Sequence, residues 1–208
     1  VRAVIETFRG DDMLSGQDVN NYPEWGAIHN FTYDNENSRI KEYWMNCYNG
    51  INYANNVIYG IGKVQESDAK MSDADYNGTL GEALFLRAYF HFKLLLNWKE
   101  IIVRDKYITD PAELSKPLSS REDAWNFIIE DLKRATSLPA TRDADNVGRA
   151  TSGSAYAYLG FAYLTRAYEE AANKDSYLAS AIEAFNQIKG YELVNNCLLY
   201  TSDAADDG

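Results

Sequence analysis

The segment Asp75–Trp98, DYNGTLGEALFLRAYFHFKLLLNW, decides the fold. Between Leu80 and Leu96 apolar side chains fall on almost every face of a helix, and the ionisable side chains are Glu82, Arg87, His91 and Lys93. A helix that is hydrophobic all round is either buried in a protein or spans a membrane. A membrane span needs about 20 predominantly apolar residues with few charges, and the ionisable groups here argue against one. The segment therefore predicts a central helix that other helices must cover.

Four more helices are predicted because apolar residues recur every three or four positions along them. They cover residues 38–62, 120–138, 151–170 and 175–189. Ser38, Ser120 and Thr151 are suitable N-caps, and Gly62 is a suitable stop. The connections at 99–118 and 139–150 are long; the first is expected to run over the surface, and no strand is strongly indicated. Paired helices of this kind predict an all-α fold, a tetratricopeptide-like helical repeat (an α-α superhelix) with long irregular loops.

Several polar residues inside the predicted helices are expected to serve the core. Arg87 should lay its stem in the core and pair its head with a carboxylate such as Glu82 or Asp131. His91 is expected to be a core imidazole whose hydrogen bonds are satisfied, and Gly160 to allow another helix to approach closely. The amides of the first long helix are expected to be buried and bonded to neighbouring backbone; they are Asn49, Asn52, Asn55 and Asn56.

Composition excludes several functions for the 208-residue chain. A net charge of -11 argues against a nucleic-acid partner, since such binding depends on clustered Lys and Arg. The two cysteines, Cys47 and Cys197, form neither a disulfide framework nor a zinc pattern, and Cys47 is expected to be a small buried apolar residue. No nucleotide-binding, P-loop or zinc-protease motif is present. The segment 143–148, DADNVG, lacks the acidic twelfth position of a calcium loop. We therefore expect no catalytic residues, no cofactor and no metal.

Residues 1–37 are expected to form an irregular N-terminal region. Residues 9–37 are rich in Gly, Asn and Asp and show no helical period. Aromatic rings are spread among these polar residues, and they include Tyr22, Trp25, Phe31 and Tyr33. Flat rings beside planar amides and carboxylates suit a sugar, which offers apolar C–H faces and a fringe of hydroxyls. The alternative is that the rings pin the loop to the body of the protein.

The first ten residues, VRAVIETFRG, contain no Met, no basic start and no long apolar run. They are therefore not a signal peptide. Because the chain opens without a capped element, the sequence favours an internal fragment of a longer protein.

Three ordered strings resemble one known family. They are GEALFLRAYFHFKLLLNW, DAWNFIIEDLKRATSLP and GRATSGSAYAYLGFAYL, and EYWMNCYNGINYANNVI precedes them. Together they resemble the SusD/RagB family of surface glycan-binding lipoproteins from starch-utilisation-type systems, over about Tyr22 to Val194. Residues 38–194 would then be an incomplete SusD-like helical domain. The last stretch, 195–208 (NNCLLYTSDAADDG), departs from the family and is expected to be a non-native tail.

The resemblance implies a function and a location. It implies non-catalytic capture of oligosaccharides at the bacterial cell surface and their delivery to a SusC-like TonB-dependent outer-membrane transporter. The protein would be a surface-exposed lipoprotein of the outer membrane, touching the membrane only through a lipid anchor absent from this sequence. By position and type, Trp25 and Asn30 match residues that line the sugar site in starch-binding relatives. Tyr22, His29 and Tyr33 are further glycan-binding candidates.

Two alternatives remain open from the sequence. One is a generic tetratricopeptide-like scaffold for protein–protein interaction, which would bind a peptide in its groove. Such a groove needs Asn, Lys or Arg on its inner helices, and the helix at 38–62 supplies Asn but almost no cation. An enzyme is the third and weakest alternative, because no nucleophile signature accompanies the histidines.

Overall fold

The computed structural model describes residues 2–10, 21–67 and 70–191. Cys197 and the tail 195–208 lie outside this part. The helices are α1 (Arg2–Thr7), α2 (Pro23–His29), α3 (Ser38–Glu66), α4 (Asp73–Asn97), α5 (Arg121–Ala135), α6 (Ser152–Glu169) and α7 (Lys174–Asn186). Within these ranges, short 3-10 turns lie in the connections between helices: η2 (Pro111–Leu114), η3 (Ala144–Asn146) and η4 (Ala171–Asn173).

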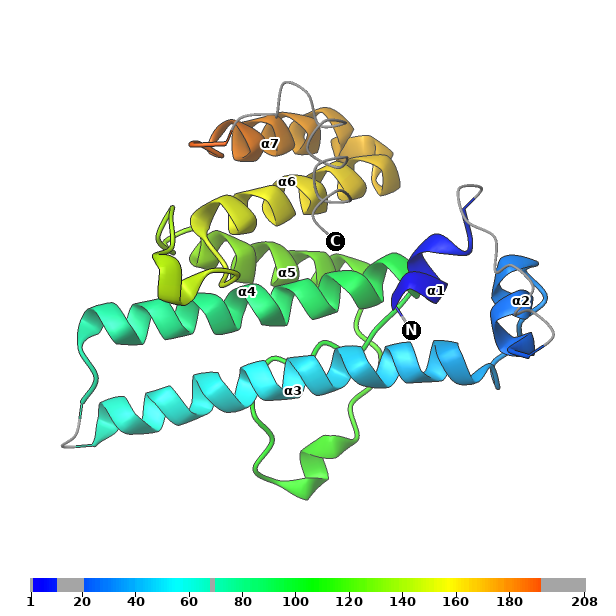
Figure 1. Cartoon of the computed structure of the whole chain (residues 1–208), viewed down its shortest axis with the longest axis horizontal. Helices are drawn as coiled ribbons and strands as arrows, with labels where there is room; N and C mark the ends of the chain where they lie inside the picture. Colours follow the sequence, from blue (N-terminus) through cyan, green and yellow to red (C-terminus); the bar gives the residue numbers. More distant parts are fainter. Residues whose placement is uncertain (1, 11–20, 68–69, 192–208) are drawn as a thin grey trace, which may run out of the picture.

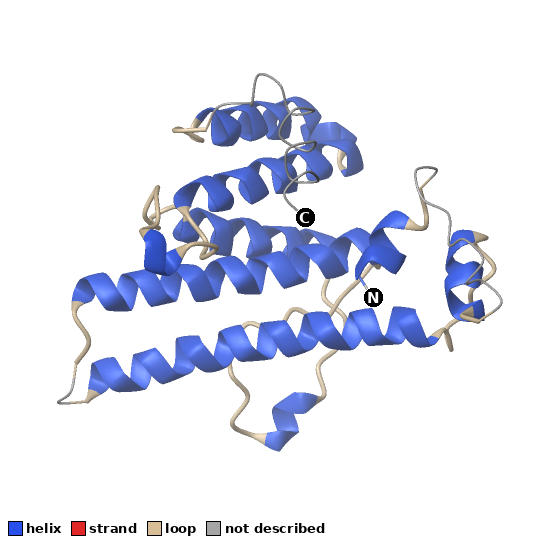
Figure 2. Cartoon of the chain, in the orientation of Figure 1, coloured by secondary structure: helices blue, strands red, loops and turns tan. Residues whose placement is uncertain are grey.

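The fold is all-α, as predicted. From α3 to α7 each helix packs against the next in sequence, so that the chain zigzags into a stack of helices (Figure 1). The two longest helices, α3 and α4, run antiparallel and form one side of the stack. Figure 2 shows no strand among the described residues, where the β pairing is limited to one isolated bridge between Ile101 and Ser119.

The central helix α4 is covered along most of its length. Leu84, Phe92, Leu94 and Leu95 are each at most 5% exposed. Phe92, Leu94 and Leu95 pack in one core with residues of α3, α5 and α6. The cover is incomplete, because Leu86 and Leu96 are 45% exposed. The expectation of burial on nearly every face is therefore correct for the faces toward α3 and α5 and wrong for these two positions.

Helix starts follow the capping rules with one shift. Ser120 Oγ accepts from the Asp123 N–H at 3.0 Å, and Thr151 forms a capping box with Ser154. For α3 the predicted cap was wrong by one residue. Asn37 is the N-cap, with its Oδ1 accepting from the Arg39 and Ile40 N–H groups, and Ser38 is the first helical residue.

Helix α3 continues past Gly62, its predicted end, to Glu66. Glycine inside a helix costs about 1 kcal/mol relative to alanine. That cost is small compared with the stabilisation gained when α3 packs along α4. Ile61, next to Gly62, is buried, with 9% of its surface exposed. Tertiary contacts therefore override the local stop signal.

The N-terminal region is not wholly irregular, so that prediction was wrong for α1 and α2. Pro23 occupies the start of α2, where its fixed φ and missing N–H favour a helix. Ile28 on α2 is fully buried, and Ile5 on α1 is 4% exposed. Helices of one or two turns are too short to show a hydrophobic period, and so the sequence pattern did not reveal them.

Helices α6 and α7 meet at Gly160. A Cβ added there would overlap the ring of Phe185, which confirms the predicted close approach. None of the helices in the described ranges combines the length and apolarity needed to cross a bilayer.

Candidate functional site

The connection from α4 to α5, residues 99–118, crosses α3 and is called the strap here (Figure 1). Two side chains of α3 hold it. The Tyr48 hydroxyl accepts from the Ile102 N–H at 2.8 Å and donates to the Ile102 carbonyl at 3.0 Å. Asn55 Nδ2 donates to the Arg104 carbonyl at 2.9 Å. Burial raises the pKa of Tyr48 to about 12, so the phenol keeps its proton and both bonds.

A buried ion pair between α4 and α5 also holds the strap in place. Arg87 on α4 and Asp131 on α5 are 6% and 2% exposed. They form a bidentate pair, Nε to Oδ2 at 2.7 Å and Nη2 to Oδ1 at 2.8 Å. Arg87 Nη1 donates further to Asn55 Oδ1 at 2.9 Å and to the Asp105 carbonyl at 2.6 Å. The predicted pairing with Asp131 is confirmed, whereas Glu82 instead bonds Arg142 and Arg149.

His91 completes this network and is fully buried. The Arg104 N–H lies 3.1 Å from Nε2, and the Arg87 carbonyl lies 2.8 Å from Nδ1. Because the first contact brings a donor and the second an acceptor, Nε2 accepts and Nδ1–H donates. Burial lowers the pKa of His91 to about 3, so the ring is neutral. The prediction of a satisfied core imidazole is confirmed.

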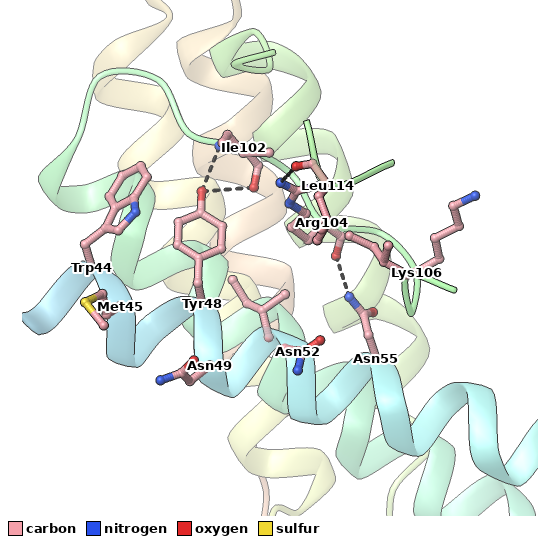
Figure 3. A pocket seen from close by; sticks show the side chains of 12 residues that line it. Trp44, Met45, Tyr48, Asn49, Asn52, Asn55, Ile102, Arg104, Lys106 and Leu114 are labelled. Carbon is pink, nitrogen blue, oxygen red and sulfur yellow. Dashed lines mark hydrogen bonds between the residues drawn. The ribbon is translucent and has the colours of Figure 1, made fainter. Parts of the chain in front are cut away.

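A cleft of about 360 Å³ opens between α3 and the strap (Figure 3). It is lined by Trp44, Met45, Tyr48, Asn49, Ile51, Asn52, Asn55, Ile102, Arg104, Lys106, Ile108 and Leu114. The Trp44 ring packs against Tyr48, with centroids 4.8 Å apart, and against Trp98 at 4.9 Å. The cleft therefore offers apolar side chains, exposed amides and the half-buried Trp44 ring.

The amides of α3 divide into two groups. Asn55 is 3% exposed and bonded to backbone, as predicted. Asn49, Asn52 and Asn56 are exposed, so the prediction of buried amides was wrong for them. Asn49 and Asn52 line the cleft beside the strap, and of the four amides only Asn55 is buried.

The predicted glycan-binding residues do not form one cluster. Tyr22 stacks on Trp25 with ring centroids 4.4 Å apart and planes inclined by 15°. Phe8 meets the Trp25 ring edge-on at 5.9 Å, and the Arg39 guanidinium carbon lies 5.9 Å from its centroid. Trp25 is thus half-buried beneath Tyr22, which is 40% exposed.

His29 and Asn30 lie at the other end of α2. Nδ1 of the half-buried His29 lies 2.9 Å from the Phe8 carbonyl, so it donates there and ties α2 to the segment after α1. Asn30 is the C-cap of α2 and is exposed. The exposed Phe31 follows it with a φ of 57°.

Tyr33 borders a second hollow, called the loop pocket here, of about 240 Å³. Its lining is Ile5, Arg9, Ile28, Tyr33, Asp34, Asn35, Ile40, Asn97 and Trp98. Arg9 donates to Asn97 Oδ1 and to the Ile5 carbonyl, which fixes its guanidinium at the pocket wall. Asp34 Oδ1 accepts from the Glu36 N–H at 3.0 Å. Within the described residues, the Tyr33 hydroxyl and the Asn35 amide make no side-chain hydrogen bond.

Sequence reasoning missed Arg9, Asn97 and Trp98 as members of this pocket. Arg9 and Asn97 are 88 positions apart, and their meeting depends on how α1 docks against the end of α4. The sequence did carry a signal, because the polar Asn97 and the aromatic Trp98 directly follow the apolar run of the central helix. In the described part of the chain, no group of three or more His, Cys, Asp or Glu side chains is placed to hold a metal ion.

The stacked helix pairs define an α-helical repeat protein, and two hollows on its surface are lined by rings and amides. Residues 6–164 match the family described as "Starch-binding associating with outer membrane". The chain therefore belongs to the SusD-like family.

Individual relatives agree with this assignment. A SusD-like protein of Bacteroides ovatus is 29% identical over 165 residues, which cover 78% of this chain and 28% of the relative. The crystal structure of a SusD-like protein from Bacteroides fragilis has a TM-score of 0.77 and 25% identity, covering 94% of this chain and 36% of that one. A structure solved with xylogluco-oligosaccharide has a TM-score of 0.68 and 25% identity, over 93% of this chain and 38% of that one. The chain thus spans under a third of the curated relative and a little over a third of the solved structures.

Proposed function

We propose that this protein binds neutral oligosaccharides at the loop pocket without catalysing their cleavage. The observation that supports the site most directly is the exposed Tyr33 ring, 39% exposed, beside the amide of Asn35. A ring can stack on the C–H face of a sugar, while amide and carboxylate groups bond its hydroxyls. Asp34 supplies a carboxylate in the same hollow, whereas the Asn97 amide is already bonded to Arg9 and to the Lys93 carbonyl. The related structure with xylogluco-oligosaccharide supports a sugar ligand.

The other predicted residues lie around α2, outside the lining of the loop pocket. Tyr22 and Asn30 are exposed and flank α2, whose C-terminal end leads into the Tyr33 segment. In this proposal Trp25 and His29 hold Tyr22 and α2 in place, because Tyr22 stacks on the Trp25 ring and His29 bonds to the Phe8 carbonyl.

We further propose that the protein works at the outer membrane and passes its ligand to a TonB-dependent transporter of the SusC type. The family description, which associates its members with the outer membrane, supports the location. The long exposed flanks of α3 and α6 offer area for a protein partner, with Tyr53 and Tyr168 67% and 71% exposed. A lipid anchor, as the family resemblance implies, would hold the protein to the membrane.

The alternative, a peptide-binding scaffold, has weaker support. The strap does bring Arg104 and Lys106 to the cleft, which supplies the cations that α3 lacks. Both are already engaged, however. Arg104 donates to the Glu113 and Leu114 carbonyls, and Lys106 pairs with the Glu113 carboxylate at 2.9 Å. A cleft whose cations already have hydrogen-bond partners, one of them a carboxylate, is less suited to an acidic peptide.

Titration calorimetry tests the proposal. The full chain is titrated with malto-, cello-, laminari- and xylogluco-oligosaccharides, and at least one is expected to bind. Tyr33→Ala should weaken that binding roughly tenfold, the value of one ring contact of about 1.4 kcal/mol. Tyr168→Ala, which removes another exposed ring, from α6, should leave the affinity unchanged. Absence of binding to every sugar, or equal losses in both variants, would contradict the proposal.

A further inference from the structure

The guanidinium group of Arg9 lines the loop pocket without a carboxylate partner. Other arginines of the described residues do pair with carboxylates; they are Arg39, Arg87, Arg121, Arg142, Arg149 and Arg166. Arg9 instead donates from Nε to the Ile5 carbonyl at 2.8 Å and from Nη2 to Asn97 Oδ1. Both acceptors are neutral, so within the described part of the chain no ion pair compensates the charge at this wall of the pocket.

The remaining nitrogen of the group, Nη1, is available to a ligand. No acceptor in the described ranges bonds to it. Among the side chains of those ranges, the polar atom that is both sealed from solvent and without a partner is Trp25 Nε1. Nη1 of the half-buried Arg9 is therefore open to solvent. Because the other two nitrogens are bonded, the plane of the guanidinium is fixed before any ligand arrives.

Asp34 is the other charged residue of the lining, and it does not neutralise Arg9. Its Oδ1 accepts from the Glu36 N–H at 3.0 Å, and its side chain is exposed. Water screens an exposed charge more strongly than a half-buried one. The pocket thus presents a cation on one wall, and on another a carboxylate and the Asn35 amide that can bond hydroxyls.

A ligand that enters this pocket displaces water from Arg9. Removing a charge from water is costly unless the charge is paired, so a wholly neutral ligand would leave the guanidinium uncompensated. A carboxylate on the ligand would supply the missing negative charge and accept a charge-assisted hydrogen bond from Nη1, which is stronger than a neutral one. The geometry of Arg9 therefore favours a ligand with one acidic group.

We infer that the loop pocket selects an oligosaccharide that carries a uronic acid unit, with the carboxylate of that unit bonded to Arg9. This inference rests on the proposed function, because it places the acidic unit within an otherwise neutral sugar chain bound beside Tyr33. The hydroxyls of the same unit bond Asp34 and Asn35. The net charge of -11 repels anions from the chain as a whole, so a preference for the acidic unit would arise locally, at Arg9.

Titration calorimetry of the full chain tests the inference by comparing each acidic sugar with its own methyl ester. The probes are xylo- and galacto-oligosaccharides substituted with one glucuronic acid, and esterification removes the charge while keeping the sugar chain. For at least one pair the acid should bind about tenfold more tightly than the ester, the value of one hydrogen bond to a charged group. Added salt should reduce this difference.

Variants of Arg9 then locate the preference. Arg9→Gln keeps a donor for Asn97 but loses the charge, so the acid should bind no more tightly than the ester, while affinity for the ester stays unchanged. Arg9→Lys keeps the charge and should retain part of the preference. Arg39→Gln is the matched control, because Arg39 precedes the pocket-lining Ile40 but is already paired with Glu24; it should keep the full preference.

Three outcomes would overturn the inference. Equal affinities of the parent for every acid and its ester would contradict it whatever the variants do, and the proposed function would stand if the neutral sugars bind. Equal losses in Arg9→Gln and Arg39→Gln would show a general attraction to positive charge rather than a site at Arg9. If the parent binds no sugar, acidic or neutral, the proposed function fails and the inference fails with it.

Discussion

At the scale of single residues, the polar core between α4, α5 and the strap is specified by donor and acceptor geometry. His91 accepts from the Arg104 N–H and donates to the Arg87 carbonyl, while Arg87 pairs with Asp131. The sequence shows that Arg87 and His91 lie in the core, because they interrupt an apolar helix. It does not select Asp131 over Glu82, since that choice depends on how α5 is rotated against α4.

The first prediction concerns acid sensitivity. The pKa of His91 in the folded protein, about 3, lies below its ordinary value of 6.5. Between these two pH values His91 is therefore protonated in the unfolded chain and neutral in the folded protein. The free energy of unfolding should therefore fall as pH drops from 6.5 toward 3, by up to about 1.4 kcal/mol per pH unit from this group. Above pH 6.5 His91 contributes no pH dependence.

Urea unfolding between pH 7.5 and pH 4.5 measures this effect. His91→Gln keeps one donor and one acceptor but does not titrate, so its stability should fall less steeply with pH than that of the parent. Carboxylates add their own acid dependence to both proteins, and the difference in slope isolates His91. Parallel slopes would contradict the prediction, because they would mean that the pKa of His91 is the same in the folded and unfolded chain.

At the scale of elements, two helical glycines differ in the space around them. A Cβ added at Gly60 in α3 would meet no atom within 4 Å, whereas a Cβ added at Gly160 in α6 would overlap the Phe185 ring. The same substitution to alanine should therefore change stability in opposite directions. Gly60→Ala should stabilise the protein by roughly 0.5–1 kcal/mol, and Gly160→Ala should destabilise it by roughly 1–3 kcal/mol.

Thermal or urea unfolding of the two variants measures the difference. Each serves as the other's control, because both replace a helical glycine by alanine. A stabilised Gly160→Ala variant would mean that α7 can move away from α6 at little cost, and that the contact does not fix their spacing.

Sequence periodicity predicted the elements that are long enough to show it. The five longest helices were expected close to where they lie, because each buries a stripe over at least three turns. Helices α1 and α2 were missed because six or seven residues cannot display that stripe. The strap was expected to be a surface connection, and this was wrong for Ile101 and Val103, which are 0% and 8% exposed. Its anchoring depends on Tyr48 and Asn55, whose partners lie about 50 positions away.

At the scale of the whole molecule, the loop pocket combines segments that are remote in sequence. Residues around 5–9, 28–40 and 97–98 meet where α1 and α2 dock at one end of α3 and α4. Aromatic and Asn-rich composition drew attention to the segment around Tyr33 as a place where a sugar would fit. Composition did not indicate that Trp25 would be stacked beneath Tyr22, because stacking is decided by docking geometry rather than residue type.

The site proposal is tested most directly by a crystal structure of the full chain with the best-bound oligosaccharide. We expect a sugar ring in contact with Tyr33, and its hydroxyls bonded to Asn35 and other polar groups of the loop pocket. A sugar seated instead in the cleft between α3 and the strap, with the loop pocket empty, would contradict the account.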